Sequence, residues 1–143
     1  MSVDVHSDFN PSRCSTLIEL LEARAALHPE KVVFTFLPDG EEAGITVTYG
    51  ELSTRAKAIA NRFGEHTQVG DRALMLFPSG LEFIFAFFGC MYAGLIAVPA
   101  YPPRRNQNLG RLKSIIDDCD PSLVLTTSKV LTVAEPLFAE TPG

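Results

Sequence analysis

The sequence predicts an α/β fold in which a mostly parallel sheet is covered by helices, with an N-terminal helix and a β-hairpin in front of it. From residue 48 onward, helical and strand-like segments alternate, and each strand-like segment is a short, unbroken apolar run. Such runs are typical of strands buried on both faces of a parallel sheet. The helices between them supply the crossovers that parallel strands require.

The N-terminal part predicts a helix followed by a hairpin. Residues 1–14 form a polar arm, and CSTLIELLEARAALHPE then places its leucines at mostly helical spacing, with Ser15 as N-cap and Pro29 as the stop. The segment KVVFTFL is β-branched and aromatic, and GITVTY resumes that composition after a turn at about residues 38–44.

The next helix carries the clearest start signal. Thr48 precedes Glu51 by three positions, which is the spacing of a capping box, and the apolar side chains of LSTRAKAIANRF lie on one face. The run RALMLF then predicts a short buried strand, which ends at the breakers Pro78, Ser79 and Gly80.

The stretch FIFAFFGCMYAGLIAVPAY, residues 83–101, contains no charged side chain and raises the question of a membrane span. We expect a helix from Leu81 to Ala93, with Ser79 as N-cap and Gly94 as its end, and a strand from Leu95 to Val98. That helix would be about 20 Å long, whereas a span needs about 30 Å. A core helix is therefore favoured over a membrane-anchored peptide, and its lack of a polar stripe predicts that further protein covers it.

The last third continues the alternation. The tandem prolines predict that AYPPRRNQN is a loop. Leu109 to Asp118 is amphipathic and helical, SLVLTTS is a strand, and residues 129–140 form a weaker helix that Pro136 ends or kinks.

The net charge and the cysteine content argue against a nucleic-acid-binding, disulfide-rich or zinc-binding protein. A net charge of −5 argues against binding to nucleic acid, which normally requires a basic face. The three cysteines are widely spaced and fit neither a disulfide framework nor a zinc site, so a reducing cytoplasm is the simplest setting. The N-terminus has no apolar region of the kind found in secretory signals.

Three segments in order resemble the N-terminal part of the large domain of the adenylate-forming ligases: ITVTYGELSTRAKAIANRF, GDRALMLFPSGLEFIFAFFGCMYAGLIAVPAYPPRR and RLKSIIDDCDPSLVLTTS. The loop AVPAYPPRR is similar in particular to the fatty acyl-AMP ligases. The resemblance implies that the parent enzyme uses ATP and Mg²⁺ to activate a long-chain fatty acid as an acyl-adenylate. It also implies transfer of the acyl group to the phosphopantetheine of an acyl carrier protein, for polyketide, lipopeptide or lipid synthesis.

The groups needed for adenylation are not evident in this sequence. The reaction needs a glycine-rich loop closed by Lys and a carboxylate for Mg²⁺, but the lysines lie in no such loop. We therefore expect no catalytic, cofactor-binding or metal residues here. Residues 15–143 are interpreted as the N-terminal portion of the AMP-binding domain, ending before the phosphate-binding loop, inactive alone and partnered by the rest of the ligase. The alternative is a standalone α/β module that docks to a partner chain.

One segment is a candidate binding element. Tyr101, Pro102, Pro103 and Arg104 follow a predicted strand at the carboxyl edge of the sheet, where α/β proteins bind ligands, and the resemblance suggests the rim of an acyl or acceptor tunnel. A basic cluster overlaps this segment and could meet a phosphate, although a solvated loop and helix start is the simpler interpretation. Its members are Arg104, Arg105, Arg111 and Lys113.

Other chemistry-bearing residues lack the pattern of a site. The histidines are far apart and are expected at the surface, the aspartates lie at a solvated helix end without the spacing of a calcium loop, and one cysteine is expected to be a buried thiol of raised pKa. These residues are His6, His28 and His66, then Asp117, Asp118 and Asp120, and finally Cys90.

Overall fold

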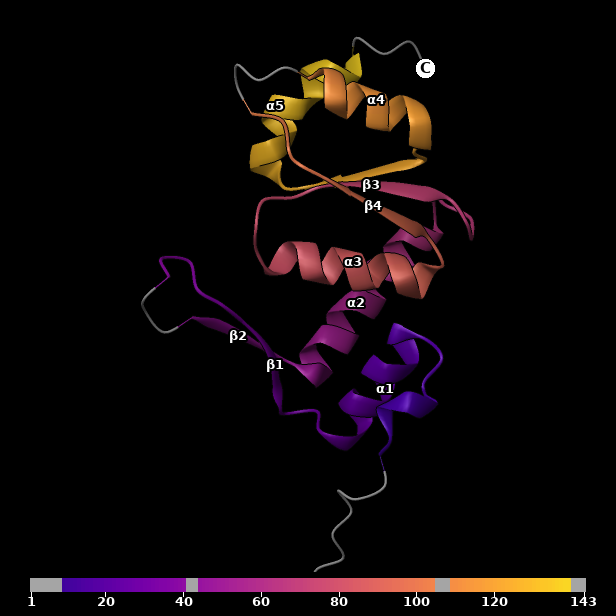
Figure 1. The fold of residues 1–143 in the computed structure, drawn as a ribbon, viewed down its shortest axis with the longest axis vertical. Helices are drawn as coiled ribbons and strands as arrows, with labels where there is room; N and C mark the ends of the chain where they lie inside the picture. Colours follow the sequence, from indigo (N-terminus) through magenta and orange to yellow (C-terminus); the bar gives the residue numbers. More distant parts are fainter. Residues whose placement is uncertain (1–8, 41–43, 105–108, 140–143) are drawn as a thin grey trace, which may run out of the picture. The chain divides into compact units, whose positions relative to one another are not determined.

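The computed structural model describes residues 9–40, 44–104 and 109–139. The chain divides into two compact units, Met1–Ser53 and Thr54–Gly143. One long helix, α2 (Tyr49–Gly64), begins in the first unit and continues into the second. Figure 1 shows the order of the elements along the chain.

The N-terminal unit contains the predicted helix and hairpin. Its elements are η1 (Pro11–Arg13), α1 (Leu17–Leu27), β1 (Val32–Phe36) and β2 (Ile45–Thr48). The two strands pair antiparallel, with an irregular register near Val32. Of the predicted polar arm, residues 1–8 lie outside the described residues, and the short helix η1 occupies part of the remainder.

The helix starts in this unit are set by hydroxyl caps. The capping box before α2 is confirmed, because Thr48 Oγ1 accepts from the Glu51 amide at 3.2 Å and Glu51 Oε2 accepts from the Thr48 amide at 2.9 Å. The prediction of Ser15 as the cap of α1 was wrong by one residue. Thr16 Oγ1 accepts from the Glu19 amide at 3.1 Å, and Glu19 in turn binds the Ser15 amide.

The C-terminal unit is a three-stranded parallel sheet with helices on both faces, as the alternation predicted. The strands lie in the order β4-β3-β5, and Figure 1 shows α3 on one side of the sheet and α4 and α5 on the other. The elements are β3 (Arg72–Leu76), α3 (Leu81–Ala93), β4 (Ile96–Ala100), α4 (Gly110–Cys119), β5 (Leu123–Thr126) and α5 (Ser128–Ala139).

The central strand β3 explains why its sequence shows no polar alternation. Ala73 and Met75 belong to the core on the α3 side, whereas Leu74 and Leu76 belong to the core formed with α4 and α5. Because successive side chains of a strand point to opposite faces, both sets must be apolar when both faces are covered. All four residues are fully buried.

Several expected boundaries in this unit differ from those of the structure, including the end of β4, which is Ala100 and not Val98, and α4, which is shifted by one residue. The N-cap of α3 is Gly80, not Ser79, and no side chain caps it. Strand β4 starts at Ile96 because the Leu95 amide still donates to the Cys90 carbonyl, which makes Leu95 part of the helix exit. Helix α5 continues past Pro136 to Ala139, so this proline does not end the helix, and the alternative of a kink stays a prediction.

The apolar helix α3 is a core helix. No helix within the described ranges combines the length and hydrophobicity needed to cross a membrane. Helix α2 supplies part of the expected cover, since a methyl group added to Gly89 would lie 2.7 Å from Cγ2 of Ile59. At the same crossing, the Arg55 guanidinium lies 4.8 Å from the centre of the Phe85 ring. Cover by protein beyond this chain stays a prediction.

Candidate functional site

A cavity of about 590 Å³ lies at the carboxyl edge of the parallel sheet. It is open to solvent and is bordered by the ends of β3 and β4, the loop that follows β4, and the first turns of α4. Its lining residues are Phe77, Pro99, Ala100, Tyr101, Pro102, Pro103, Arg104, Leu109, Arg111, Leu112 and Ile115. All four residues predicted for a tunnel rim therefore line one cavity, together with residues of the following helix.

The local sequence explains how this wall is built. Strand β4 carries the chain to the sheet edge, and Pro102 and Pro103 then prevent either regular structure from continuing. The two prolines are half-buried, whereas Tyr101 exposes 85% of its surface. Leu112 lies on the buried side of α4 and belongs to the core that α4 forms with the sheet. The cavity therefore has an apolar wall and an exposed aromatic ring.

The charged groups on this cavity are cationic. Among the described residues that line it, Arg104 and Arg111 carry formal charge, and both are exposed. Of the other two members of the predicted basic cluster, Lys113 is exposed and is not part of the lining, and Arg105 lies outside the described residues. An apolar wall beside two guanidinium groups suits a ligand that combines an apolar body with an anionic group.

A second cavity, of about 380 Å³, was not anticipated from the sequence. It lies where the carboxyl ends of β3 and β5 meet, and Phe77 contributes to both cavities. Chain connections leave these two strands toward opposite faces of the sheet, which is the arrangement that opens a crevice in α/β folds. The position of this second cavity follows from the strand order, which the sequence alone does not predict. The lining is Ile59, Phe63, Phe77, Glu82, Phe85, Ala86, Leu125, Thr126, Thr127 and Ser128.

Neither cavity brings together a catalytic set. Within the described ranges, no group of His, Cys, Asp and Glu side chains could hold a metal ion. Burial raises the pKa of the Cys90 thiol to about 11, as expected for an inert core cysteine. His66 is exposed, as predicted, His28 is half-buried at the end of α1, and His6 lies outside the described residues.

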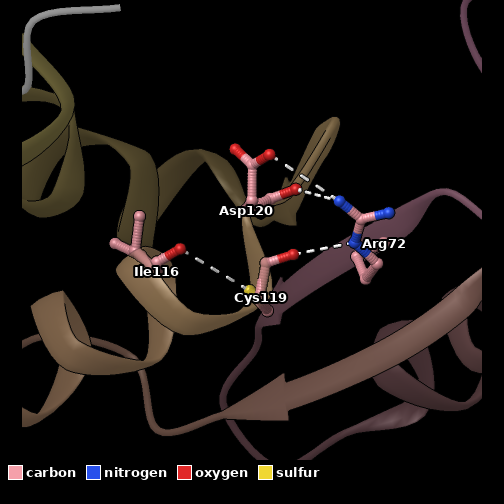
Figure 2. Close-up of polar contacts among 4 residues, drawn as sticks. All are labelled: Arg72, Ile116, Cys119 and Asp120. Carbon is pink, nitrogen blue, oxygen red and sulfur yellow. Dashed lines mark hydrogen bonds and ion pairs between the residues drawn. The ribbon is translucent and has the colours of Figure 1, made fainter.

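One of the aspartates at the end of α4, Asp120, takes part in a structural contact at the amino end of strand β3 (Figure 2). Arg72, at the start of β3, donates to the backbone carbonyl oxygens of Cys119 at 2.8 Å and Asp120 at 2.9 Å. The Asp120 side chain is 95% exposed and lies 3.8 Å from the same guanidinium group. Asp117 and Asp118 are exposed, as predicted for a solvated helix end.

Comparison with known proteins identifies the family of this chain. A family model described as AMP-binding enzyme matches residues 21–141. A medium-chain-fatty-acid–[acyl-carrier-protein] ligase of Moorena producens is 43% identical over 78% of this chain and 19% of its own length. A long-chain-fatty-acid–AMP ligase of Mycolicibacterium smegmatis is 35% identical over 90% of this chain and 21% of its own length.

Solved structures give the same result. A fatty acyl-adenylate ligase of Legionella pneumophila, in complex with acyl adenylate and pyrophosphate, matches with a TM-score of 0.80 and 38% identity. The match covers 88% of this chain and 22% of that protein. The chain thus spans about a fifth of the length of the relatives that it matches.

Proposed function

Because this chain belongs to the AMP-binding enzyme family, we propose that it is the N-terminal part of a fatty acid–AMP ligase. Residues 15–143 would form the first portion of the large domain, ahead of the phosphate-binding loop. The observation that carries the proposal is the similarity over nearly the whole chain to a ligase solved with acyl adenylate and pyrophosphate. The cavity at the sheet edge supports it, because an apolar wall beside cationic groups suits an acylated anion.

The proposed reaction of the whole ligase joins a fatty acid carboxylate to the α-phosphate of ATP and releases pyrophosphate. The phosphopantetheine thiol of an acyl carrier protein then attacks the acyl-adenylate, which forms a thioester and releases AMP and the thiol proton. Among the described residues, no group of His, Cys, Asp and Glu side chains could hold Mg²⁺. The remainder of the ligase would hold ATP and Mg²⁺, and this chain alone would be inactive.

Within that ligase, the part played by this chain is to bind and orient. Tyr101, Pro102, Pro103 and Arg104 would form the rim of the acyl or acceptor tunnel. The prolines limit the conformations of the loop and would thereby hold the Tyr101 ring and the Arg104 guanidinium at the tunnel entrance. Both residues line the cavity, and Tyr101 is exposed, which supports this role. The cytoplasm is the proposed compartment, because the reaction consumes ATP and the described cysteines are free thiols.

A chimera tests the proposal. Residues 1–143 would replace the corresponding segment of the Legionella pneumophila ligase, and fatty-acid-dependent exchange of pyrophosphate into ATP would be measured. We expect exchange by the chimera, and none by the isolated chain or by the Legionella ligase that lacks the segment. A folded chimera without exchange would favour a standalone interaction module. Exchange by the isolated chain would disprove its inactivity.

A further inference from the structure

We infer that Phe77 forms the boundary between the two cavities at the carboxyl edge of the sheet, and that its side chain limits the length of the acyl chain that the site accepts. The inference rests on the proposed function, in that it takes the ligand to be a fatty acid. Of the described residues that line either cavity, Phe77 alone occurs in both linings.

The strand register explains why Phe77 lies between the cavities. It directly follows Leu76, the last residue of β3, which pairs with Ala100 of β4 on one side and with Thr126 of β5 on the other. Ala100 lines the first cavity, and Thr126 lines the second. The residue after Leu76 therefore stands where the two cavities approach each other.

The two cavities are associated with opposite faces of the sheet. Leu112 and Ile115 of α4 line the first, whereas residues of α2 and α3, among them Phe63 and Phe85, line the second. Figure 1 shows α3 and α4 on opposite sides of the sheet. Beyond the last residues of the strands the sheet no longer separates these faces, and the Phe77 side chain is the group that both cavities share there.

The surroundings of Phe77 are held in place. Leu76 is fully buried, and its carbonyl oxygen accepts from Thr126 Oγ1 at 2.7 Å, which ties the end of β3 to the end of β5. The half-buried Phe77 ring meets the Phe83 ring edge-on, with 6.4 Å between the ring centres. Because a folded protein relaxes only partly around a truncated side chain, a smaller residue at this position should open the boundary.

The charges at the two cavities determine the direction of the ligand. Among the described lining residues, Arg104 and Arg111 carry the formal charge of the first cavity, and Glu82 carries that of the second. A carboxylate is attracted by guanidinium groups and repelled by another carboxylate. The anionic end of a fatty acid therefore belongs in the first cavity, and its hydrocarbon chain points toward Phe77.

The second cavity offers apolar surface that the chain does not reach while the Phe77 ring is in place. Its apolar lining includes Ile59, Phe63, Phe85 and Leu125. Each methylene group that moves from water to apolar surroundings strengthens binding by about fourfold. Removal of the ring therefore favours longer fatty acids, and a larger ring favours shorter ones.

Chain-length profiles of the chimera described above test the inference. Values of kcat/KM in pyrophosphate exchange would be measured for a series of saturated fatty acids with the wild type, Phe77→Ala and Phe77→Trp. We expect Phe77→Ala to raise the preference for longer fatty acids by about fourfold for each methylene that enters the second cavity, and Phe77→Trp to lower it.

Phe83→Ala is the matched control, because Phe83 is also half-buried, contacts Phe77 and lines neither cavity. An unchanged profile for Phe77→Ala, or an equal shift for Phe83→Ala, would overturn the inference. A constant profile combined with a changed KM for the carrier protein in the transfer step would also overturn it, because the boundary would then belong to the path of the acceptor.

If the chimera shows no exchange, direct binding decides. Calorimetry would measure the dissociation constants of the same fatty acids, below their micelle concentrations, for the isolated chain and its variants. We expect the affinity of the wild type to stop improving at a shorter chain length than that of Phe77→Ala, with Phe83→Ala like the wild type. Absence of binding, or one common limit, would then contradict the inference. A difference in binding without exchange would leave the inference standing and the proposed function refuted.

Discussion

Arg72 Nε donates a hydrogen bond of 2.8 Å to the backbone carbonyl oxygen of Cys119, so the first residue of β3 holds the last residue of α4. The Arg72 carbonyl also accepts from the Ser122 amide at 3.0 Å, at the entry to β5. The Arg72 side chain thereby joins the central strand to the end of a helix (Figure 2), and its backbone carbonyl joins it to the beginning of the neighbouring strand. Carbonyl groups at the C-terminal end of a helix lack hydrogen-bond donors within the helix. The Arg72 guanidinium donates to two of them, and its positive charge interacts favourably with the negative end of the helix dipole.

Arg72→Ala is expected to lower the free energy of unfolding by about 1 to 2 kcal/mol, since two carbonyl partners are lost at a half-exposed position. Urea denaturation of the isolated chain measures this change. Asp120→Asn should change stability by less than about 0.5 kcal/mol, because the exposed ion pair contributes little while the backbone acceptor is retained. Equal losses in both variants would assign the effect to the ion pair instead.

Gly89→Ala is expected to destabilise the chain by about 1 to 3 kcal/mol, because the new methyl group would lie 2.7 Å from Ile59 Cγ2 at the crossing of α2 and α3. Gly64→Ala is the matched control, as a methyl group there meets nothing within 4 Å. Helix propensity should make the control neutral or slightly stabilising. Thermal unfolding compares the two variants, and a larger loss in the control would contradict the close crossing.

Burial raises the pKa of Cys90 from 9.0 to about 11, which makes stability depend on pH in alkaline solution. The folded state favours the neutral thiol, so this contribution is fully present below pH 9.0 and is lost as the pH rises toward about 11. We expect the free energy of unfolding of the wild type to fall over this window more steeply than that of Cys90→Ala. Parallel pH profiles of the two proteins would contradict the assignment.

Arg104→Ala and Arg111→Ala, made in the chimera with the Legionella ligase, are expected to raise the KM for the acyl substrate or the carrier protein. An exposed charge contributes about 1 kcal/mol, which corresponds to roughly fivefold in KM. Lys113→Ala is the control, because that residue is on the same helix as Arg111 and does not line the cavity. The effect should shrink as salt is added. An equal increase in KM for Lys113→Ala would mean that the positive electrostatic potential of this surface, and not contact within the cavity, lowers the KM.

The choice of N-cap shows where local prediction reached its limit. The capping box of Thr48 and Glu51 was predictable because both partners lie within one turn. At α1, the adjacent hydroxyls Ser15 and Thr16 were equally suitable by residue type, and only the backbone geometry chose the second. At α3, the N-cap Gly80 has an extended conformation and no side chain to form a cap.

Local patterns in the sequence were enough to predict the order and kind of the elements, the length that makes α3 too short for a membrane span, and the position of the loop at Tyr101–Arg104. These properties follow from periodicity, caps and breakers, which act over a few residues. The strand order β4-β3-β5 and the meeting of that loop with Arg111 around one cavity result from long-range packing instead. The second cavity and the Arg72 contact have the same origin. All of these features depend on which segments, far apart in the sequence, pack against each other. The spacing of residues within one segment does not specify those long-range contacts.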